Sequence, residues 1–470
     1  MKKIFYFISA AFLFTLASCE EKLDIKPLGM TTLDTVSDLE TLLNWEPDIE
    51  ILEISYTNEF EILCGNCFYT SALAQSLGNP NSLQYAILTG DETVDRAALT
   101  ATCRRYNDLY RKIMYSNVVI SKMPDATGGT EAKKAQLIAE AKVLRAWYHF
   151  LLVNIYAQQY DAATAAKLGG VAYVNHTDVG QQKNKNSVEE VYNRMLEDCS
   201  DDVLAALIQS NVADPCRFGV DFGYGVRARV LFQMKRYDEA LRYARLALGV
   251  NGTIEDRSVV KSTRSWDLPR NSPNNYLLRN RANTNIGDYW YLQITPELAS
   301  LIDPDDYVLK YEADGWDPTL SPTDFPEGAM GFWGSGTAHF NICGIRSETM
   351  YYLAAECLIR NGSIREGLAE IDKVRALRIE NYTPYADMAD RLTEKEAMKL
   401  LQNAKRVEFL HTVENFFDRK RWNSEADYAE TIYHNLGEYG TFALKPDSPL
   451  WVFPFPADAV NYNSSLTQNY

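Results

Sequence analysis

The chain has 470 residues, of which 47 are Lys or Arg and 63 are Asp or Glu, so its formal net charge is −16. Hydrophobic residues make up 46% of the chain, which is enough for a substantial core and excludes global disorder. The acidic balance excludes nucleic acid as a general partner, because such partners need a basic surface, and five histidines leave little material for metal or acid–base sites.

The first segment, residues 1–18, is predicted to be a lipoprotein signal peptide. Two lysines precede an apolar run over residues 4–17, which is too short to span a bilayer as a mature helix and fits a secretory signal. Residues 16–19, Leu-Ala-Ser-Cys, resemble the bacterial lipobox, in which the cysteine is acylated and becomes the mature N-terminus. The alternative is an ordinary signal peptide with an incidental cysteine. We expect Cys19 to carry the lipid.

Cys64 and Cys67 form the one close cysteine pair of the remaining chain. Zinc would need a second ligand pair nearby, but no Cys or His lies between Cys67 and Cys103. A redox pair would open a helix after a strand, and the flanking residues do not show this clearly. A disulfide within a loop and two plain thiols both remain as interpretations.

Helical periodicity dominates from about residue 106 onward. A short helix is predicted over 35–45, and the Asn-, Gly- and Ser-rich stretch over 56–95 is predicted to be loop. Further helices are predicted over 106–123, 187–207 and 393–423, the second of these beginning with a capping box at Ser187 and Glu190. The clearest helix spans 131–156, where apolar residues recur at alternating +4 and +3 steps.

Two predicted helical hairpins share one register. Ala228 and Ala355 occupy equivalent positions before a turn, and each residue of the first hairpin has its equivalent 127 residues later. Small residues at Ala240 and Gly367 allow the two helices of each hairpin to approach closely. This is typical of tetratricopeptide units, whose period is about 34 residues. Because the copies are not contiguous, we expect helix pairs embedded in a larger domain; generic helix hairpins are the alternative.

Between the hairpins, residues 251–341 lack helical periodicity and are rich in Pro, Asn, Gly and Trp. An exposed aromatic ring can pack against the apolar face of a sugar while Asn, Asp or Arg bonds its hydroxyl groups. Alternatively, most of these rings pack the core of their own lobe. The aromatic candidates for ligand binding are Trp266, Tyr289, Trp290, Tyr291, Trp316 and Trp333, and the other candidates are Asn58, Tyr69, Arg279 and Asn283.

No motif for catalysis is present. The sequence contains no GxSxG, HExxH or GxxxxGK[ST] pattern, so we expect the protein not to be an enzyme and to need no cofactor. Asp303-Pro304-Asp305 faintly resembles a calcium loop but lacks the EF-hand order, so structural calcium has no further support. His149 and His411 lie in predicted helices, as do Trp147 and Trp422, and all four are interpreted as packing residues.

Several segments taken together resemble the SusD/RagB family of nutrient-binding lipoproteins. Residues 19–27, CEEKLDIKP, resemble the start of the family's mature chain, and residues 140–148, EAKVLRAWY, resemble its "EA…RA-aromatic-Tyr" helix. The tail, with FPFP over 453–456 and QNY over 468–470, is similar to the family's ending. At Asn415 the family usually has Gly. The family's late helix motif is matched by Arg406, Glu408, Glu414, Phe416, Asp418, Arg421 and Trp422.

The resemblance implies a mostly α fold, in which tetratricopeptide-like hairpins form a right-handed helical scaffold with an irregular, loop-rich lobe. It implies one SusD-like domain over 19–470, with helical parts at 19–250 and 342–470 around a lobe at 251–341. It also implies a lipid-anchored protein on the outer face of the outer membrane, which captures an oligosaccharide for a SusC-like TonB-dependent transporter. The alternatives are a peptide-binding lid of such a transporter, or an interaction protein without a small ligand.

Overall fold

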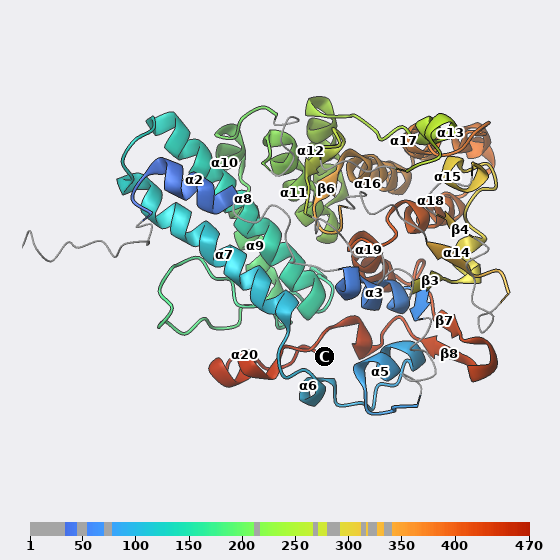
Figure 1. Cartoon of the computed structure of the whole chain (residues 1–470), viewed down its shortest axis with the longest axis horizontal. Coiled ribbons are helices and arrows are strands. Elements are labelled where there is room, and N and C mark those ends of the chain that lie inside the picture. The colour runs from blue at the N-terminus through green and yellow to red at the C-terminus, as the bar shows by residue number, and fades with distance from the viewer. Residues whose placement is uncertain are drawn as a thin grey trace, which may run out of the picture.

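The computed structural model describes residues 33–44, 54–69, 78–210, 217–266, 271–279, 292–311, 316–317, 327–332 and 341–470. Helices dominate these residues, and many run side by side in antiparallel pairs (Figure 1). The predicted mostly α class is therefore confirmed. None of the described helices combines the length and the apolar character that crossing a membrane requires.

The elements follow one another in an order that places the sheet strands mainly in the middle of the chain. The main helices are α2 (Val36–Asn44), α3 (Ile54–Leu63), α5 (Leu83–Thr89), α6 (Arg96–Leu99), α7 (Arg104–Lys122), α8 (Glu131–Tyr156), α9 (Val188–Asp198), α10 (Asp201–Ala205), α11 (Val220–Gln233), α12 (Tyr237–Val250), α13 (Val260–Thr263), α14 (Pro296–Ala299), α15 (Tyr307–Lys310), α16 (Ser347–Arg360), α17 (Ile364–Arg375), α18 (Glu394–Glu408), α19 (Glu414–Asn423) and α20 (Ala457–Tyr462). The strands are β1 (Cys67–Tyr69), β2 (Asn275–Leu277), β3 (Leu292–Ile294), β4 (Trp316–Asp317), β5 (Met330–Phe332), β6 (Ile345–Arg346), β7 (Ile432–Asn435) and β8 (Thr441–Leu444).

The two predicted hairpins, α11–α12 and α16–α17, turn in the same way. Lys235 and Gly362, which are 127 residues apart, both have a left-handed backbone, with φ of 61° and 81°. After each of them, a backbone N–H bonds back to the carbonyl five residues earlier, from Arg236 to Leu231 and from Ser363 to Leu358, at 2.9 Å in both hairpins. The shared register inferred from the sequence is therefore a shared turn geometry.

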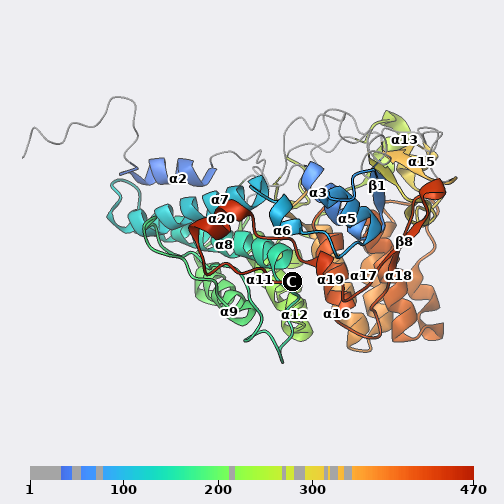
Figure 2. The same ribbon diagram turned by 90° about the horizontal axis from the view of Figure 1, so that it is seen from below.

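Close helix packing explains the small residues of these hairpins. A Cβ added at Gly367 would lie 2.7 Å from the carbonyl oxygen of Ala355, so only glycine fits without a shift of the backbone. Ala240 is fully buried in the corresponding position of the first hairpin. Helix α12 packs against α16 and α17 against α18, so the two hairpins stack directly although about a hundred residues separate them in the sequence. Figure 2 shows α16, α17 and α18 together at one end of the molecule.

Three segments differ from the sequence-based prediction. The prediction of loop over 56–95 is wrong in part, because α3 overlaps this stretch and α5 lies within it. Helix α5 is capped by Ser82, whose Oγ accepts from the N–H of Tyr85, and it ends at Gly90. The helix predicted over 187–207 is interrupted at Cys199 and Ser200 and continues as α10, although the capping box at its start is confirmed. The zone 393–423 is two helices, because the backbone turns left-handed at His411. Short caps of this kind stop helices that apolar periodicity alone would continue.

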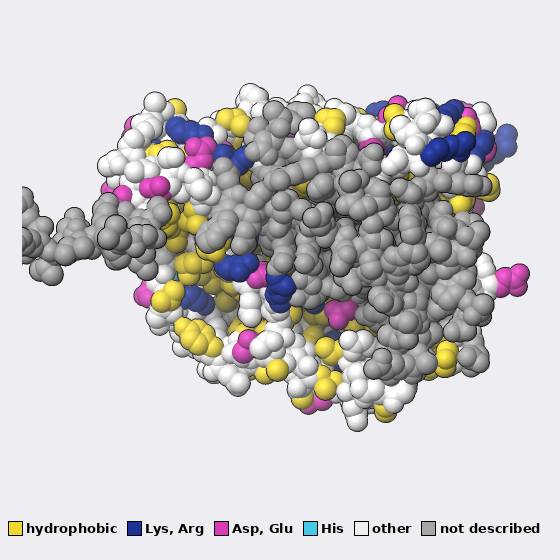
Figure 3. All heavy atoms as spheres, viewed as in Figure 1, with side chains coloured by type: hydrophobic (Ala, Val, Ile, Leu, Met, Phe, Trp, Pro, Cys, Tyr) yellow, Lys and Arg dark blue, Asp and Glu magenta, His cyan; other side chains and the backbone are white. Residues whose placement is uncertain are grey.

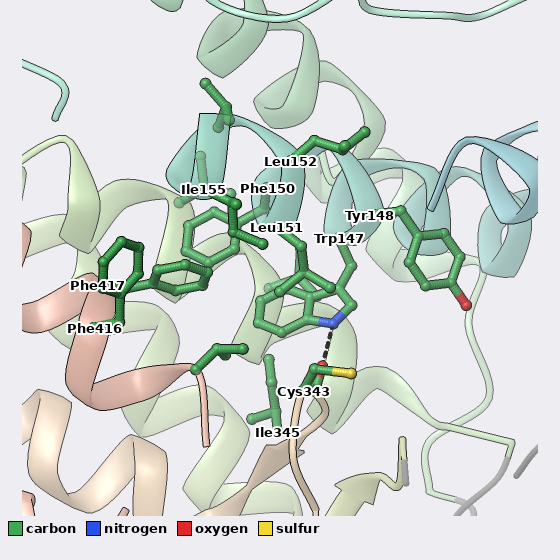
Figure 4. Packing of buried hydrophobic residues seen from close by; sticks show 14 of the residues in the cluster. Trp147, Tyr148, Phe150, Leu151, Leu152, Ile155, Cys343, Ile345, Phe416 and Phe417 are labelled. Carbon is green, nitrogen blue, oxygen red and sulfur yellow. Dashed lines mark hydrogen bonds between the residues drawn. The ribbon is translucent and has the colours of Figure 1, made fainter. Parts of the chain in front are cut away.

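Trp147 ties α8 to the part of the chain that follows the irregular lobe. Its indole is fully buried and stacks on Phe150, with the ring centroids 5.0 Å apart. Its Nε1 donates a hydrogen bond of 2.8 Å to the carbonyl oxygen of Cys343 (Figure 4). Trp422 is also buried, so the prediction that both rings pack the core is confirmed.

Buried ion pairs join the stacked helices. Arg421 of α19 bonds both carboxylate oxygens of Glu356 on α16, at 2.6 and 2.8 Å, and both side chains are fully buried. Arg229 of α11 pairs with Glu414 of α19 at 2.7 Å, and Asp418 of α19 pairs with Arg421 and with a lysine of α18. Burial opposes ionisation of Glu356, but the charges of Arg421 and its neighbours outweigh it and hold the pKa of Glu356 below its usual range.

Removing one partner of this buried pair is expected to destabilise the fold strongly. The substitution Glu356→Ala leaves the guanidinium of Arg421 buried without its main partner, and we expect a loss of about 3–5 kcal/mol in the free energy of unfolding. Urea denaturation measures this loss. The matched control is Glu239→Ala, which removes the exposed Arg236–Glu239 pair and is expected to cost less than about 1 kcal/mol. Equal losses in the two variants would contradict the argument.

His149 is held as a neutral ring inside the fold. Its Nδ1 lies 2.8 Å from the carbonyl oxygen of Arg145, and its Nε2 accepts a hydrogen bond of 3.0 Å from the N–H of Val174. These partners favour a proton on Nδ1 and a lone pair on Nε2. Burial, which is complete for this side chain, lowers the pKa of His149 to about 3.

Stability is therefore expected to fall as the pH falls. Because the pKa of an unfolded histidine is about 6.5, the unfolded chain binds a proton between that pH and the folded pKa of about 3, whereas the folded protein does not. This contribution is fully present above the unfolded pKa and is lost progressively below it. NMR of the imidazole nitrogens should show His149 neutral at pH 5 in the folded protein. An imidazolium signal for His149 at that pH would contradict this prediction.

Candidate functional site

A four-stranded sheet joins strand β1, at residues 67–69, to three strands that lie between residues 292 and 332. Its strand order is β1-β3-β5-β4, and all the pairings are antiparallel. Tyr69 of β1 pairs with Leu292 of β3, and Trp316 of β4 pairs with Phe332 of β5. Two of the predicted site residues, Tyr69 and Trp316, are thereby brought into one sheet although 247 positions separate them.

The other aromatic candidates of the lobe lie next to strands of this sheet in the sequence. Tyr289, Trp290 and Tyr291 directly precede β3 in the sequence, and Trp333 directly follows β5. β3 and β5 pair with each other, with Gln293 opposite Gly331. The sheet therefore brings together, on neighbouring strands, the residues that border these aromatic candidates in the sequence.

Buried polar contacts connect the sheet to the helical body. The amide of Asn66 donates to Glu61 at 2.6 Å, and Nε of Arg406 on α18 donates to Oδ1 of Asn66 at 2.8 Å. Thr295, which follows β3, bonds the carbonyl oxygens of Asn66 and Gly65 through its N–H and its hydroxyl, both at 2.9 Å. Sequence reasoning did not identify Glu61 or Asn66, since their other partners, in Thr295 and the residues from Arg406 to Asn415, lie more than 200 positions away.

The Glu61 carboxyl is an unusual part of this connection. Burial raises the pKa of Glu61 to about 7, although hydrogen bonds from Asn66, Asn415 and the N–H of His411 oppose the shift. Asn415, where the resembled family usually has Gly, also donates to the carbonyl oxygen of Arg406 at 3.2 Å. The departure from the family pattern thus supplies an amide that binds α18 beneath the sheet.

The cysteine pair flanks the turn between α3 and β1, and Cys67 is the first residue of β1. Cys64 and Cys67 are both free thiols and both buried, so the structure selects plain thiols from the two interpretations. Gly65 between them has φ of 69°, a left-handed conformation that suits glycine. Burial raises the pKa of both thiols above the usual range, which keeps them protonated.

Trp266 and Arg279 lie inside the protein. Trp266 is 9% exposed, and its Nε1 donates to Glu255 at 2.6 Å while the guanidinium of Arg257 lies 4.4 Å from the ring centroid. Arg279 is buried, with its N–H bonded to Asn341 Oδ1 at 3.1 Å and its Nη1 to the carbonyl oxygen of Leu278. This burial favours a role in positioning the lobe, and direct ligand contact by either residue stays a prediction.

The remaining predicted residues are described only in part or not at all. For Asn58, Tyr69 and Trp316 the structure describes the backbone, in α3, β1 and β4. Cys19, Tyr289, Trp290, Tyr291, Asn283 and Trp333 lie outside the described residues. The ligand roles of all these residues stay predictions.

Charged side chains lie close together in the first turns of α7. Asp108 lies 3.5 Å from Arg104 and 3.2 Å from Arg111, and both arginines are nearly half exposed. Figure 3 shows Lys or Arg and Asp or Glu side chains together on one face, over the region where Figure 1 places α7. The two guanidinium groups can donate to hydroxyl groups and the carboxylate can accept from them.

A cavity of about 350 Å³ lies beside the first residues of α7, and three arginines, Arg96, Arg104 and Arg105, line it. Arg96 donates to the carbonyl oxygens of Val452 and Pro449, at 2.8 and 3.0 Å, and its guanidinium lies 4.1 Å from the ring centroid of Tyr470. Arg105 bonds the hydroxyl of Tyr156 at 3.4 Å. Arg96 thus holds the C-terminal tail against the helical body, so its presence does not indicate an anion site.

The described ranges contain no group of three or more His, Cys, Asp or Glu placed to hold a metal ion. In the segment with a faint likeness to a calcium loop, Asp303 accepts from the N–H of Asp305 at 2.9 Å, and Asp305 pairs with Lys310 at 2.7 Å. These contacts engage the two carboxylates within the protein.

Comparisons with known proteins agree on one family. A family model described as "Starch-binding associating with outer membrane" matches residues 33–214, and the SusD family model matches residues 320–470. Comparison with curated protein sequences finds no match.

Solved structures share the fold over nearly the whole chain. A SusD superfamily protein from Bacteroides fragilis has a TM-score of 0.70 at 17% identity, covering 93% of this chain and 100% of its own. One from Bacteroides thetaiotaomicron has a TM-score of 0.69 at 15% identity, with the same coverage. A SusD-like carbohydrate binding protein from Bacteroides vulgatus has a TM-score of 0.64 at 15% identity, covering 92% of this chain and 97% of its own.

These solved structures are similar to the chain in fold, and the two family models match separate parts of the chain. The matched ranges contain both the N-terminal helices from α2 to α10 and the late helices with the buried ion pairs. The structural matches extend across the intervening lobe as well. The chain belongs to the SusD family.

Proposed function

We propose that the protein is a surface lipoprotein that captures an oligosaccharide and delivers it to a SusC-like TonB-dependent transporter. The observation that carries this proposal is the four-stranded sheet, which joins the segments next to Tyr69, Tyr291, Trp316 and Trp333. Aromatic rings on a rigid helical body suit a ligand whose apolar faces are rimmed by hydroxyl groups. The description of the family model as starch-binding supports the same class of ligand.

Two further observations support the proposed location at the outer membrane. The family model that matches residues 33–214 is described as associating with the outer membrane. The lipobox-like residues 16–19 supply an attachment point at Cys19. An acidic body with a lipid at one end needs no basic face to stay at a membrane, since the acyl chains supply the affinity.

Loss of the indole rings in the lobe is expected to weaken sugar binding. In the double variant Trp316→Ala/Trp333→Ala we expect a loss of about 2 kcal/mol, or roughly 30-fold in Kd, because stacking rings are typical hot spots. Calorimetric titration with neutral hexasaccharides measures the change. The control is Tyr433→Ala, which removes a 64% exposed ring on β7, a strand that belongs to a separate two-stranded sheet with β8.

Two outcomes would contradict the glycan proposal. Unchanged sugar affinity in the double variant would remove Trp316 and Trp333 from the site. Saturable binding of peptides, in the absence of any sugar binding, would favour the peptide-binding lid instead.

Replacement of Cys19 by serine is expected to release the protein from the membrane. Serine cannot accept the thioether-linked lipid, so the variant should move from the detergent phase to the aqueous phase in a phase-partition assay, whereas the wild type stays in the detergent phase. Intact mass of the N-terminal peptide checks the acylation directly. Equal partition of the wild type and Cys19→Ser would contradict the anchor.

A further inference from the structure

A cleft of about 730 Å³ lies between α7, the segment 172–183 and the C-terminal tail with α20. This volume falls within the range of about 300–1,000 Å³ that is typical of small-molecule sites. Residues of α7 and α20 line the cleft together, and Figure 1 shows α20 at the lower left and β3 and β4 at the right of the molecule. Figure 2 shows α20 over α7 and α8. The cleft is therefore separate from the sheet that frames the aromatic lobe.

Tyr462 at the end of α20 stands at the mouth of this cleft. Its side chain is 76% exposed, yet its hydroxyl donates a hydrogen bond of 2.9 Å to the carbonyl oxygen of Val179. Val179 is itself 69% exposed. The bond fixes an aromatic ring that remains mostly in water, so a ligand that stacks on the ring would cost little further loss of side-chain freedom.

The inner wall of the cleft is aromatic and rigid. Tyr106 and Tyr110 are one helical turn apart on α7, with ring centroids 4.8 Å apart, and the hydroxyl of Tyr110 donates to the carbonyl oxygen of Ala172 at 2.9 Å. Met114 continues the same wall one turn further along. Figure 3 shows hydrophobic side chains gathered over this part of the molecule. The spacing of four residues places the two tyrosines on one face of α7, which the sequence alone can show. Only the fold brings Tyr462 to the same cleft.

Polar groups with unused hydrogen-bonding capacity line the rest of the cleft. Among the described residues, the side chains of Asn107 and Ser464 have no hydrogen-bond partner, although both line the cleft. The Lys183 amine is engaged by the carbonyl oxygen of Gln181 at 2.8 Å. Asp458 is the one carboxylate and Lys183 the one cation among the described lining residues, so the lining carries no net formal charge.

We propose that this cleft is a second binding site for a neutral oligosaccharide, in which Tyr462 stacks against a sugar ring. Asn107 and Ser464 supply neutral donors and acceptors for the hydroxyl groups, and the carboxylate of Asp458 supplies further acceptor oxygens. Because Lys183 and Asp458 balance each other, the lining gives no advantage to an anionic ligand. The proposal rests on the proposed function for the class of ligand, and it differs in the place where the ligand binds. A second site on the same body strengthens the hold on a long chain that can reach both sites.

The test uses the full mature chain and calorimetric titration with five neutral probes: maltohexaose, cellohexaose, xylohexaose, mannohexaose and laminarihexaose. In the Trp316→Ala/Trp333→Ala background, we expect the preferred probe to retain binding at one site. Adding Tyr462→Ala should weaken that residual binding at least tenfold, and Asn107→Ala should weaken it severalfold. Tyr462→Phe, which keeps the ring, should stay within about threefold of the background.

The matched control is Tyr433→Ala, another exposed tyrosine, which should leave the residual binding unchanged. Because Tyr462 is mostly exposed, its substitution should leave the midpoint of thermal unfolding unchanged, which separates lost binding from lost folding.

The outcomes distinguish this proposal from the function proposed above. If the lobe variant loses all binding, or if Tyr462→Ala leaves the residual binding intact, the cleft is not a sugar site and the lobe assignment is unaffected. If the lobe variant binds like the wild type and Tyr462→Ala removes binding, the cleft is supported and the lobe assignment is overturned. If no probe binds to the wild type, both proposals are overturned for neutral glycans.

Discussion

The buried pair between Glu356 and Arg421 is the contact on which the arrangement of the helices depends. It joins α16 to α19 without access to water, and each of the two charges is stabilised mainly by the other, with Asp418 and Arg360 as further partners. Arg229 extends the same connection to α11 through Glu414. A buried network of this kind allows one relative position of the helices, because any shift would leave a charge without its partner.

The position of the aromatic lobe follows from these same helices. Arg406 on α18 bonds Asn66 at the start of the sheet, while Thr295 closes the sheet onto the same turn. The residues that match the family's late helix motif thus act mainly inside the protein, as ion-pair and hydrogen-bond partners. Their role is to place the sheet, and through it the segments that carry the candidate aromatic rings, on a rigid support.

The C-terminal tail contributes more than an ending to the fold. Arg96 holds it through the carbonyl oxygens of Val452 and Pro449, and the amide of Asn469 donates to the carbonyl oxygens of Tyr156 and Gly170, both at 2.8 Å. These bonds bring α20 against α7 and create the cleft beside Tyr462. Its wall combines the first long helix with nearly the last residues of the chain.

Local patterns in the sequence determined much of the scaffold. The apolar stripe predicted α8 from Glu131 to Tyr156, and the register of the two hairpins predicted their shared turn, because periodicity, caps and small residues act over a few positions. Turn chemistry was underestimated where it overrode periodicity, at Cys199 and at His411. The motifs also indicated the family, since their order along the chain could be read directly.

Tertiary structure alone decided which of these elements meet. The stacking of α12 on α16, the pairing of Tyr69 with Leu292 and the approach of Tyr462 to α7 all join positions far apart in the chain. No local pattern encodes such contacts, because they arise when apolar faces and buried charges find partners across the whole core. The sequence determined the aromatic composition of the candidate sites, and the fold decided where rings and hydrogen-bonding groups come together.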